Sequence, residues 1–377
     1  MGQIKSGNPD RQMSNNPTFG VEEEFLLVDP RTGEPIARNK AVAETAAAKG
    51  VDLQLELTSC QVETATEVMD NSDDLRKALL RLRRVATDAA ETNGARLLAA
   101  GLPPTVPHKF PITPTPRYRR IGHRFGMIAH EQGICGCHVH VEVPSRDAAI
   151  RVSNRLRPWL HLLLALTANS AIYRGSDSGY ATFRSVLWAR WPSAGPPPFF
   201  DSEAQYDATV AMLEDAGAAL DDGMIYWDVR PSNKFPTVEV RVSDVPATVA
   251  ETVLFATLVR AAVMTATEAE KNGEPVVPLT DYVLKAAYWK SARDGLDGRT
   301  IDLAESHAVA PTVELLTNFV EHLRPALEQL GEYDTVRGEL ARVIETGNGA
   351  MRQRRAFERR REAADVIDEL AAATIAE

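Results

Sequence analysis

The feature that most constrains the fold of this chain is an alternation of apolar and polar residues in four short segments. The segments are GVEEEFLL at 20–27, LQLELT at 53–58, CGCHVHVEV at 135–143 and TVEVRVS at 237–243. Successive side chains of a β-strand point to opposite faces, so each segment would have one apolar and one polar face as a strand. The pattern predicts an antiparallel sheet that packs one face against the hydrophobic core.

The polar faces of these strands carry groups that can bind metal ions or phosphates. Glu22 and Glu24 share the polar face of the first segment, and Glu239 and Arg241 share that of the last. Glu23 falls on an apolar face, where the sequence offers no reason for an acid. The other residues expected on polar faces are Gln54, Glu56, Thr58, His138, His140 and Glu142.

The residue types on these faces favour a bound cation over plain solvent exposure. For any single strand, a solvated face is the simpler interpretation. These faces, however, are rich in acids and contain almost no lysine, whereas solvated faces usually mix both charges. Clustered carboxylates repel one another, and one takes up a proton unless a cation lies among them. Divalent metal ions prefer oxygen ligands, so the pattern predicts a divalent metal site.

Cys135 and Cys137 stand beside His138 and raise the alternative of a zinc site. On a strand both cysteines point away from the histidine, and their spacing differs from the CxxC of structural zinc sites. We therefore interpret them as small buried apolar groups. Two alternatives stay open: a zinc-dependent hydrolase that uses His138, His140 and Glu142, and a metal-storing protein without catalytic activity.

The order of elements predicts an α+β fold with one domain at residues 18–377, preceded by a loose tail at 1–17. Ser72 is a good N-cap for a helix that Asn93-Gly94 closes. The stretch at 103–117 holds six prolines, so it is expected to be an irregular loop and a candidate lid. Helices are expected at 118–131, at 146–172 and over most of the chain from 247 onward.

Composition argues against several functional classes. The 377 residues carry a formal net charge of −10, and acids soon follow the basic run at 351–361, so we expect no nucleic-acid binding. No uninterrupted run of about 18 apolar residues occurs, so we expect no membrane span. The N-terminus lacks the apolar region of a secretory signal, and three cysteines are too few for a disulfide framework. These features favour the cytoplasm.

Five motifs, in their order along the chain, resemble one protein family. GVEEEFLLVDP, GCHVHVEV, WDVRPS, TVEVRVSD and GNGAMRQR are similar to motifs of the bacterial carboxylate–amine ligases of the glutamate–cysteine ligase type 2 group. The resemblance runs from about Thr18 over nearly the whole chain. It implies a fold like that of glutamine synthetase and the guanidino kinases: a curved antiparallel β-sheet with helices on its convex side and the substrates on its concave face.

The resemblance also implies a reaction. The γ-phosphoryl group of ATP would pass to a carboxylate to give an acyl phosphate, which an amine would attack to form an amide or peptide bond. Phosphoryl transfer of this kind needs positioning and charge neutralisation more than covalent chemistry from the protein. The expected partners are an amino-acid carboxylate, an amine and further copies of the same chain, in a homo-oligomer such as a dimer. A phosphotransferase of the guanidino kinase type is the nearest rival.

The family motifs assign a metal and phosphate site to residues of this chain. The implied metal ligands are Glu22, Glu24, Glu63, His138 and Glu239. Arg241 would reach the γ-phosphoryl group during transfer, so Arg241 and Glu24 are the expected catalytic residues. Mg²⁺ is the expected ion, and Mn²⁺ is an alternative because imidazole is an unusual ligand for Mg²⁺. Glu56 resembles an acid of the more distant classical ligases.

Further residues are weaker candidates for binding substrate or nucleotide. Arg230 could bind phosphate, but a pair with Asp228 is an equal alternative. Arg352 and Arg354 follow a glycine-rich turn and could bind phosphate, or could belong to a solvated basic helix face. The remaining substrate candidates are His140 and Arg184, of which Arg184 lies in a stretch that could equally be a structural loop.

Overall fold

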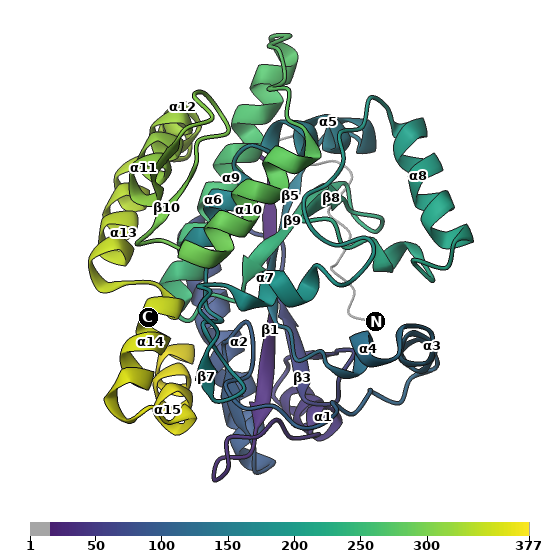
Figure 1. The fold of residues 1–377 in the computed structure, drawn as a ribbon, viewed down its shortest axis with the longest axis vertical. Coiled ribbons are helices and arrows are strands. Elements are labelled where there is room, and N and C mark those ends of the chain that lie inside the picture. The colour runs from purple at the N-terminus through teal and green to yellow at the C-terminus, as the bar shows by residue number, and fades with distance from the viewer. Residues whose placement is uncertain (1–15, 377) are drawn as a thin grey trace.

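Residues 16–376 are described in this computed structural model, and within them the alternating segments form one antiparallel sheet (Figure 1). The strand order is β2-β3-β1-β5-β9-β8, and β4 pairs with the end of β1. Two short hairpins, β6–β7 and β10–β11, lie outside this sheet. The strand bounds are β1 Phe19–Val28, β2 Gln54–Leu55, β3 Gln61–Ala65, β4 Arg96–Leu98, β5 Gly136–Glu142, β6 Ile172–Tyr173, β7 Ser176–Asp177, β8 Val229–Pro231, β9 Thr237–Asp244, β10 Arg299–Ile301 and β11 Val309–Pro311.

Helices gather mainly on the apolar face of the sheet, where Val21, Val139 and Val240 join one buried cluster with residues of α5, α6 and α9. The C-terminal helices α11–α15 lie along the left side of Figure 1. The helix bounds are α1 Asn39–Ala48, α2 Ser72–Thr92, α3 Pro116–Phe125, α4 Met127–His130, α5 Arg146–Leu156, α6 Leu160–Leu166, α7 Phe183–Trp188, α8 Glu203–Asp215, α9 Val249–Lys271, α10 Asp281–Asp294, α11 Thr312–His322, α12 Arg324–Leu330, α13 Tyr333–Thr346, α14 Gly349–Arg360 and α15 Ala363–Thr374.

The predicted α+β class with an antiparallel sheet is confirmed. A separate, aromatic-rich cluster contains residues of α3, α4, α5, α8 and the segment before β8, with Trp188 of α7 packed against it. It borders the polar face, because its Trp188 lies under the guanidinium of Arg184 and its Tyr226 under that of Arg241. Aromatic residues therefore cover the polar face near Arg184 and Arg241.

Several predicted element bounds need correction. LQLELT is a strand only at Gln54–Leu55, because the chain turns away before its bridge at Thr58. The helix expected to start from Ser72 is instead capped by Asn71, whose side chain accepts a hydrogen bond from the backbone N–H of Asp74. The helix expected at 118–131 is divided at Gly126, whose φ of 55° interrupts helical geometry.

Helix α9 is the one helix of the described chain that is long and apolar enough to cross a membrane. It lies inside the fold, however, and 89% of its most apolar window is buried. It packs against β5, α2, α5, α12 and α13. A search for an uninterrupted apolar run does not find α9, because this helix also contains polar and charged residues. Its burial identifies it as a core helix.

The predicted N-terminal tail falls mostly on residues 1–15, which lie outside the described residues. The two described residues of that segment are attached to the helical side. Pro17 accepts a hydrogen bond from Nε of Arg260 at 2.9 Å, and Asn16 accepts one from Gln329 at 2.9 Å. Two residues before the predicted boundary at residue 18 thus take part in the contacts of the fold.

Glu23, the acid that the sequence left unexplained, is fully buried in an ion pair with Arg83 of α2. Arg83 contacts both carboxylate oxygens, at 3.0 and 2.6 Å, and Thr252 of α9 donates a further hydrogen bond at 2.7 Å. Arg83 also donates to the backbone oxygens of Pro246, Ala247 and Thr374. The pair joins β1 to α2, α9 and α15 from behind the polar face.

Candidate active site

The strand register brings the polar-face residues into three rows across the sheet. Glu22 on β1 lies opposite His138 on β5. One row nearer the start of β1, His140 lies opposite Glu239 on β9, which in turn lies opposite Arg230 on β8. One row further along β1, Glu24 lies opposite Glu63 on β3. The alternation within each strand and the antiparallel pairing together produce one continuous polar surface.

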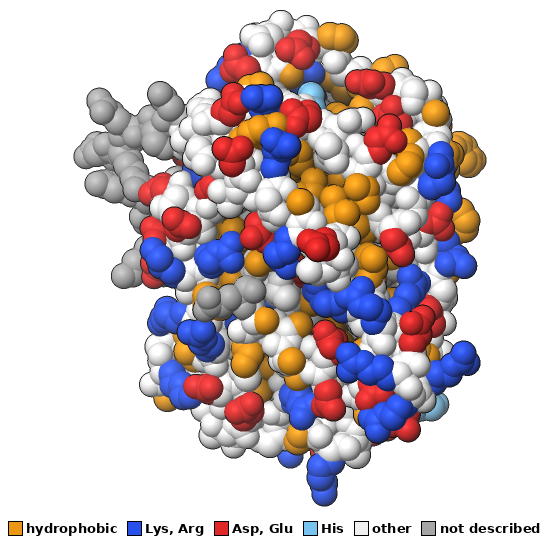
Figure 2. Space-filling model, turned by 90° about the vertical axis from the view of Figure 1, so that its left-hand side faces the viewer, with side chains coloured by type: hydrophobic (Ala, Val, Ile, Leu, Met, Phe, Trp, Pro, Cys, Tyr) orange, Lys and Arg blue, Asp and Glu red, His pale blue; other side chains and the backbone are white. Residues whose placement is uncertain are grey.

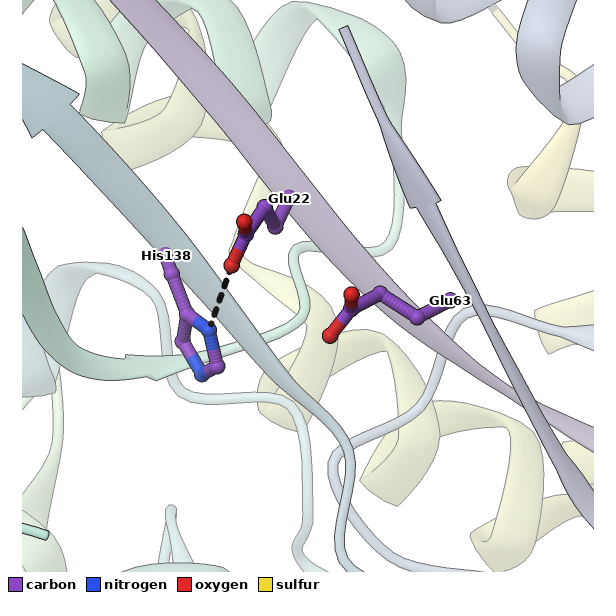
Figure 3. A group of neighbouring side chains, drawn as sticks. All are labelled: Glu22, Glu63 and His138. Carbon is purple, nitrogen blue, oxygen red and sulfur yellow. Dashed lines mark hydrogen bonds and ion pairs between the residues drawn. The ribbon is translucent and has the colours of Figure 1, made fainter. Parts of the chain in front are cut away.

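The middle row centres on Glu22 and His138. Nδ1 of His138 lies 3.4 Å from Oε2 of Glu22, and Glu63 points into the same space from β3 (Figure 3). One ligand atom from each of these three residues lies within 4.8 Å of the others. Three strands that are distant in sequence thus supply one group of potential metal ligands.

Two more groups of potential ligands adjoin this one. Glu24, Glu56 and Glu63 form the first, and Glu22, His140 and Glu239 form the second, each within the same 4.8 Å limit. Glu24 also accepts a hydrogen bond at 2.7 Å from the backbone N–H of Gly136. The three groups share members, so the acids form a single connected cluster along β1.

Arginines occupy the side of the surface opposite the acids. Arg230 binds Glu239 with its Nε 2.9 Å from Oε2, and Arg241 pairs with the other oxygen of Glu239. Arg230 therefore pairs with Glu239 rather than with Asp228, because the antiparallel pairing of β8 with β9 places Arg230 directly opposite Glu239. Arg241 also approaches Nδ1 of His138 at 3.5 Å. The surface thus has an acidic half on β1 and β3 and an arginine-containing half on β9 and β8.

The acids nearest β3 favour their protonated forms. Burial raises the pKa of Glu56 to about 8, and the charge of Glu24 adds to the effect. Burial also raises the pKa of Glu63 well above its usual value, with further contributions from Glu22, Glu56 and Glu24. These carboxyl groups would need either protons or a cation to lie so close together.

The acids nearest the histidines and arginines favour their charged forms. Burial works to raise the pKa of Glu22, but hydrogen bonds and charge from His138 and His140 outweigh it and hold the pKa well below its usual value. Burial opposes ionisation of Glu239 too, but Arg230 and Arg241 dominate and lower its pKa. The anionic charge of the surface is therefore concentrated where imidazoles and guanidinium groups face it.

The donor set fits divalent metal ions. Carboxylate oxygens are the ligands that Mg²⁺ and Mn²⁺ prefer, and the surface offers five carboxylates and two imidazoles. Nε2 of His140 lies 3.6 Å from Oε2 of Glu22, and its Nδ1 lies 3.1 Å from the hydroxyl of Thr237, so this imidazole also faces the acidic cluster. Glu22, Glu24, Glu56, Glu63, His138 and Glu239 could hold the ions, which would neutralise charge on bound phosphates.

Arg184 reaches the surface from outside the sheet. It belongs to α7, is 3% exposed, and lies beside Gly136 and His138. A Cβ on Gly136 would lie 2.5 Å from Nη2 of Arg184, so the missing side chain leaves the space that the guanidinium occupies. The structure thus brings Arg184, one of the predicted substrate-binding residues, to the same surface as the acids.

Arg352 and Arg354 lie elsewhere. Arg352 is bound to Glu251 at the start of α9, with Nη1 2.7 Å from Oε1, and also donates to the backbone oxygen of Gly347. Arg354 pairs with Asp177 of the β6–β7 hairpin at 3.1 Å. Both guanidinium groups are engaged by acids on the side of α9 and α14, so their contacts do not support a place on the polar surface.

The basic helix that carries these arginines is balanced by acids. Figure 2 shows basic and acidic side chains interspersed on the face formed by the C-terminal helices. Arg359 and Arg360 pair with Glu369 and Asp365 of the neighbouring helix α15. The run that looked basic in sequence therefore presents no surface of a single charge on this face.

The geometry does not support a zinc hydrolase. Cys135 and Cys137 are fully buried on the apolar side, where burial raises the pKa of both thiols. Glu142, the third residue of that hypothesis, instead accepts hydrogen bonds from the backbone and side chain of Thr18 at 3.0 and 2.9 Å. Neither cysteine nor Glu142 belongs to a metal-binding group found among the described residues.

Two parts of the site are poorly indicated by the sequence: Glu56, and the aromatic residues Trp188 and Tyr226 beside the arginines. The alternation in LQLELT already placed Glu56 on the polar face. The strand ends at Leu55, however, so the tertiary fold and not the strand brings the Glu56 carboxylate close to Glu24 and Glu63. Trp188 and Tyr226, whose rings lie 4.7 Å apart, carry no local signal of their position. Their proximity to Arg184 and Arg241 depends on the packing of separate loops.

Comparison with known proteins gives one family. Residues 18–371 match the family described as glutamate-cysteine ligase family 2. A protein of Mycolicibacterium vanbaalenii named "Putative glutamate--cysteine ligase 2-2" is 66% identical over 363 residues, which cover 96% of this chain and 99% of that protein. A Nocardia farcinica protein named "Putative glutamate--cysteine ligase 2-1" is 59% identical over 361 residues, 95% of this chain and 94% of that protein.

Solved structures of low sequence identity share the fold. A glutamate–cysteine ligase from Francisella tularensis in complex with AMP superimposes with a TM-score of 0.67 at 14% identity, over 95% of this chain and 88% of that one. A bifunctional glutathione synthetase from Pasteurella multocida gives a TM-score of 0.70 at 15% identity over 95% of this chain. This chain spans about half of that longer protein, 52% of its length.

Proposed function

The chain belongs to glutamate-cysteine ligase family 2, a family of ATP-dependent ligases that form C–N bonds, and we propose that it joins glutamate to an amine such as cysteine on its polar surface. Glutamate and cysteine are the substrates in the names of its relatives. The observation that carries the proposal is the division of one surface into an acidic half and an arginine-containing half. That division suits a nucleotide held through its metal-bound phosphates, next to a carboxylate that accepts phosphate.

The acidic half would bind the nucleotide through divalent metal ions. Bound ions would supply neutralisation of the phosphate charge, which is the main requirement of phosphoryl transfer. Glu22, Glu24, Glu56 and Glu63 are the carboxylates of this half, and His138 lies at its border with the arginines. We propose Mg²⁺ as the ion, with Mn²⁺ as an alternative because imidazole takes part.

The arginine-containing half would stabilise charge on the group in transfer. A carboxylate oxygen of glutamate attacks the γ-phosphorus, ADP leaves, and an acyl phosphate forms. Arg241 is buried, is fixed by Glu239, and keeps its Nε without a partner among the described residues. We assign Arg241 to the γ-phosphoryl oxygens, where a preformed donor in a water-poor site has its largest effect.

The second half of the reaction makes the amide. The amine attacks the carbonyl carbon of the acyl phosphate, and phosphate leaves with the oxygen that came from the carboxylate. Arg230 shares Glu239 with Arg241 and lies at the outer row of the surface. It would help to hold the phosphate as it leaves, and the aromatic residues Trp188 and Tyr226 would limit the access of water to the acyl phosphate.

A hydroxamate assay tests this function. Purified protein is incubated with ATP, Mg²⁺, single amino acids and hydroxylamine, which converts an acyl phosphate to a hydroxamate. We expect hydroxamate formation that depends on glutamate and on ATP, and its loss in Glu24→Gln. Release of phosphate that never depends on an added carboxylate would contradict the proposal, and stable phosphorylation of a guanidine would indicate the kinase rival.

We also propose a cellular setting and an assembly for the protein. The three cysteines are free and buried, which suits a reducing cytoplasm. The family resemblance suggests a homo-oligomer, and a dimer is the simplest form. Light scattering on the purified protein measures its mass in solution and tests the second point directly.

A further inference from the structure

Arg184 is held rigidly at the deep end of the polar surface. Its backbone N–H donates to Oγ of Ser170 at 3.0 Å, and Nη1 lies 3.7 Å from Asp244. Asp244 is itself fixed by the backbone of Asn169 and the hydroxyls of Ser170 and Thr182, at 2.7 to 2.8 Å. A guanidinium anchored in this way has lost most of its freedom before any substrate arrives.

One edge of this guanidinium is unused. Nη1 turns to Asp244 and to the backbone oxygen of Val242, at 3.5 Å. Nε is buried without a hydrogen-bond partner among the described residues, and Nη2 lies against Gly136, whose missing side chain leaves it room. Nε and Nη2 together form the edge that binds a carboxylate through two parallel hydrogen bonds. A buried donor edge without a partner indicates a ligand.

The position of Arg184 favours a carboxylate over a phosphate. The side chains of Arg230 and Arg241 are 12% and 10% exposed, whereas that of Arg184 is 4% exposed. The deep end of the surface therefore admits a small group rather than a triphosphate. Asp244, with its Oδ1 3.7 Å from Nη1, also offsets part of the charge of this guanidinium. This balance suits an anion of charge one.

We propose that Arg184 binds the carboxylate of the donor amino acid that does not react, and so makes the enzyme selective for donors with two carboxylates. The inference rests on the proposed ligase function and adds to it a residue that recognises the substrate. A carboxylate held through both oxygens is a poor nucleophile, so the bound group is the one left intact. The second carboxylate of the donor then extends toward Glu24 and the phosphates.

The experiment compares two donors that differ by one carboxylate. Hydroxamate formation is measured with L-glutamate and with γ-aminobutyrate, which keeps the γ-carboxylate and lacks the α-carboxylate. In the wild-type protein we expect glutamate to have the lower KM. In Arg184→Gln we expect the KM for glutamate to rise about tenfold or more, the loss typical of a charged hydrogen-bond pair, while the KM for γ-aminobutyrate and for ATP changes little.

Two further variants keep the test decisive if Arg184→Gln folds poorly. Arg184→Lys keeps the charge and loses the two-pronged edge, so it should raise the KM for glutamate by a smaller factor. Gly136→Ala keeps the arginine but places a Cβ 2.5 Å from Nη2, so it should also raise that KM. Arg151→Gln, on the surface of α5, is the matched control and should change neither KM.

The outcomes separate this inference from the proposed function. Absence of hydroxamate with every carboxylate in the wild-type protein would contradict the ligase proposal itself. A wild-type protein that prefers donors with one carboxylate would overturn the role of Arg184 alone. That role is also overturned if the Arg184 variants raise the KM for both donors equally, or raise only the KM for ATP.

Discussion

Glu24 and Glu63 lie directly opposite each other on β1 and β3, two acids in one cross-strand pair. Like charges at such positions destabilise a sheet, and Glu56 adds a third carboxyl group within 4.8 Å. A fold that keeps this arrangement gives up stability at the place where it would bind a cation. The pairing of Glu24 with Glu63 is therefore what the proposed metal-dependent function requires.

The first prediction concerns the removal of one of these acids. In metal-free protein, Glu63→Gln should raise the melting temperature by about 1–2 °C, as expected for about 1 kcal/mol of relieved repulsion in a chain of 377 residues. The same variant should lose most of the stabilisation that Mg²⁺ gives to the wild-type protein. Thermal unfolding with and without EDTA measures both effects. Glu67→Gln, exposed just after β3, is the control and should leave both unchanged.

The second prediction concerns pH. The pKa of Glu56 is about 8 in the folded protein and near 4.5 in the unfolded chain, so the folded state binds more protons between these values. The stability of the metal-free protein should therefore fall as pH rises from about 4.5 to about 8 and level off above that. Urea unfolding in EDTA at several pH values measures the slope, and Glu56→Gln should reduce it. A wild-type slope of the opposite sign would count against the arrangement of acids.

The third prediction separates two neighbours on β1. Arg83→Met leaves Glu23 buried without its partner and should cost about 3–5 kcal/mol of unfolding free energy. The double variant Glu23→Leu with Arg83→Met should recover much of that loss. Glu22→Gln, one residue away on the other face, should cost less stability than Arg83→Met and should weaken metal binding. Denaturant unfolding and metal titration of the three proteins distinguish a structural acid from a site acid.

The fourth prediction concerns the buried thiols. Cys137→Ala should retain metal binding and most turnover, because the thiol lies in the core on the opposite face from His138. We expect a destabilisation of about 1 kcal/mol from the small cavity. Elemental analysis of the metal-loaded variant provides the check. Loss of one equivalent of metal in this variant would revive the zinc interpretation.

Alternation along single strands accounts for the part of the site that the sequence could predict. It placed Glu22, Glu24, His138, Glu239 and Arg241 on polar faces, because side-chain direction within a strand is a local property. Which residue lies opposite which is not local. The register shift between β5 and β9 near His138, which lets Arg241 approach that histidine, has no sequence signature in either strand.

The points that the sequence could not decide share this origin. The partner of Arg230 was ambiguous because Asp228 is near in sequence, whereas Glu239 is brought near by strand pairing. Glu23 could not be explained because Arg83 lies 60 residues away on another element. Glycine-rich sequence before Arg352 looked like a phosphate loop, but the arginine is held by Glu251 of α9. In each instance tertiary packing, not local preference, chose the partner.

Transfer of phosphate from ATP to a carboxylate is the central step of the proposed reaction, and the fate of one oxygen atom tests it most directly. The enzyme is given glutamate with ¹⁸O in its γ-carboxylate, together with ATP, Mg²⁺ and cysteine, and the released phosphate is analysed by mass spectrometry. We predict one ¹⁸O atom in each phosphate released by the wild-type protein, and no such phosphate from Glu24→Gln. Amide formation with phosphate that carries no ¹⁸O would contradict the mechanism.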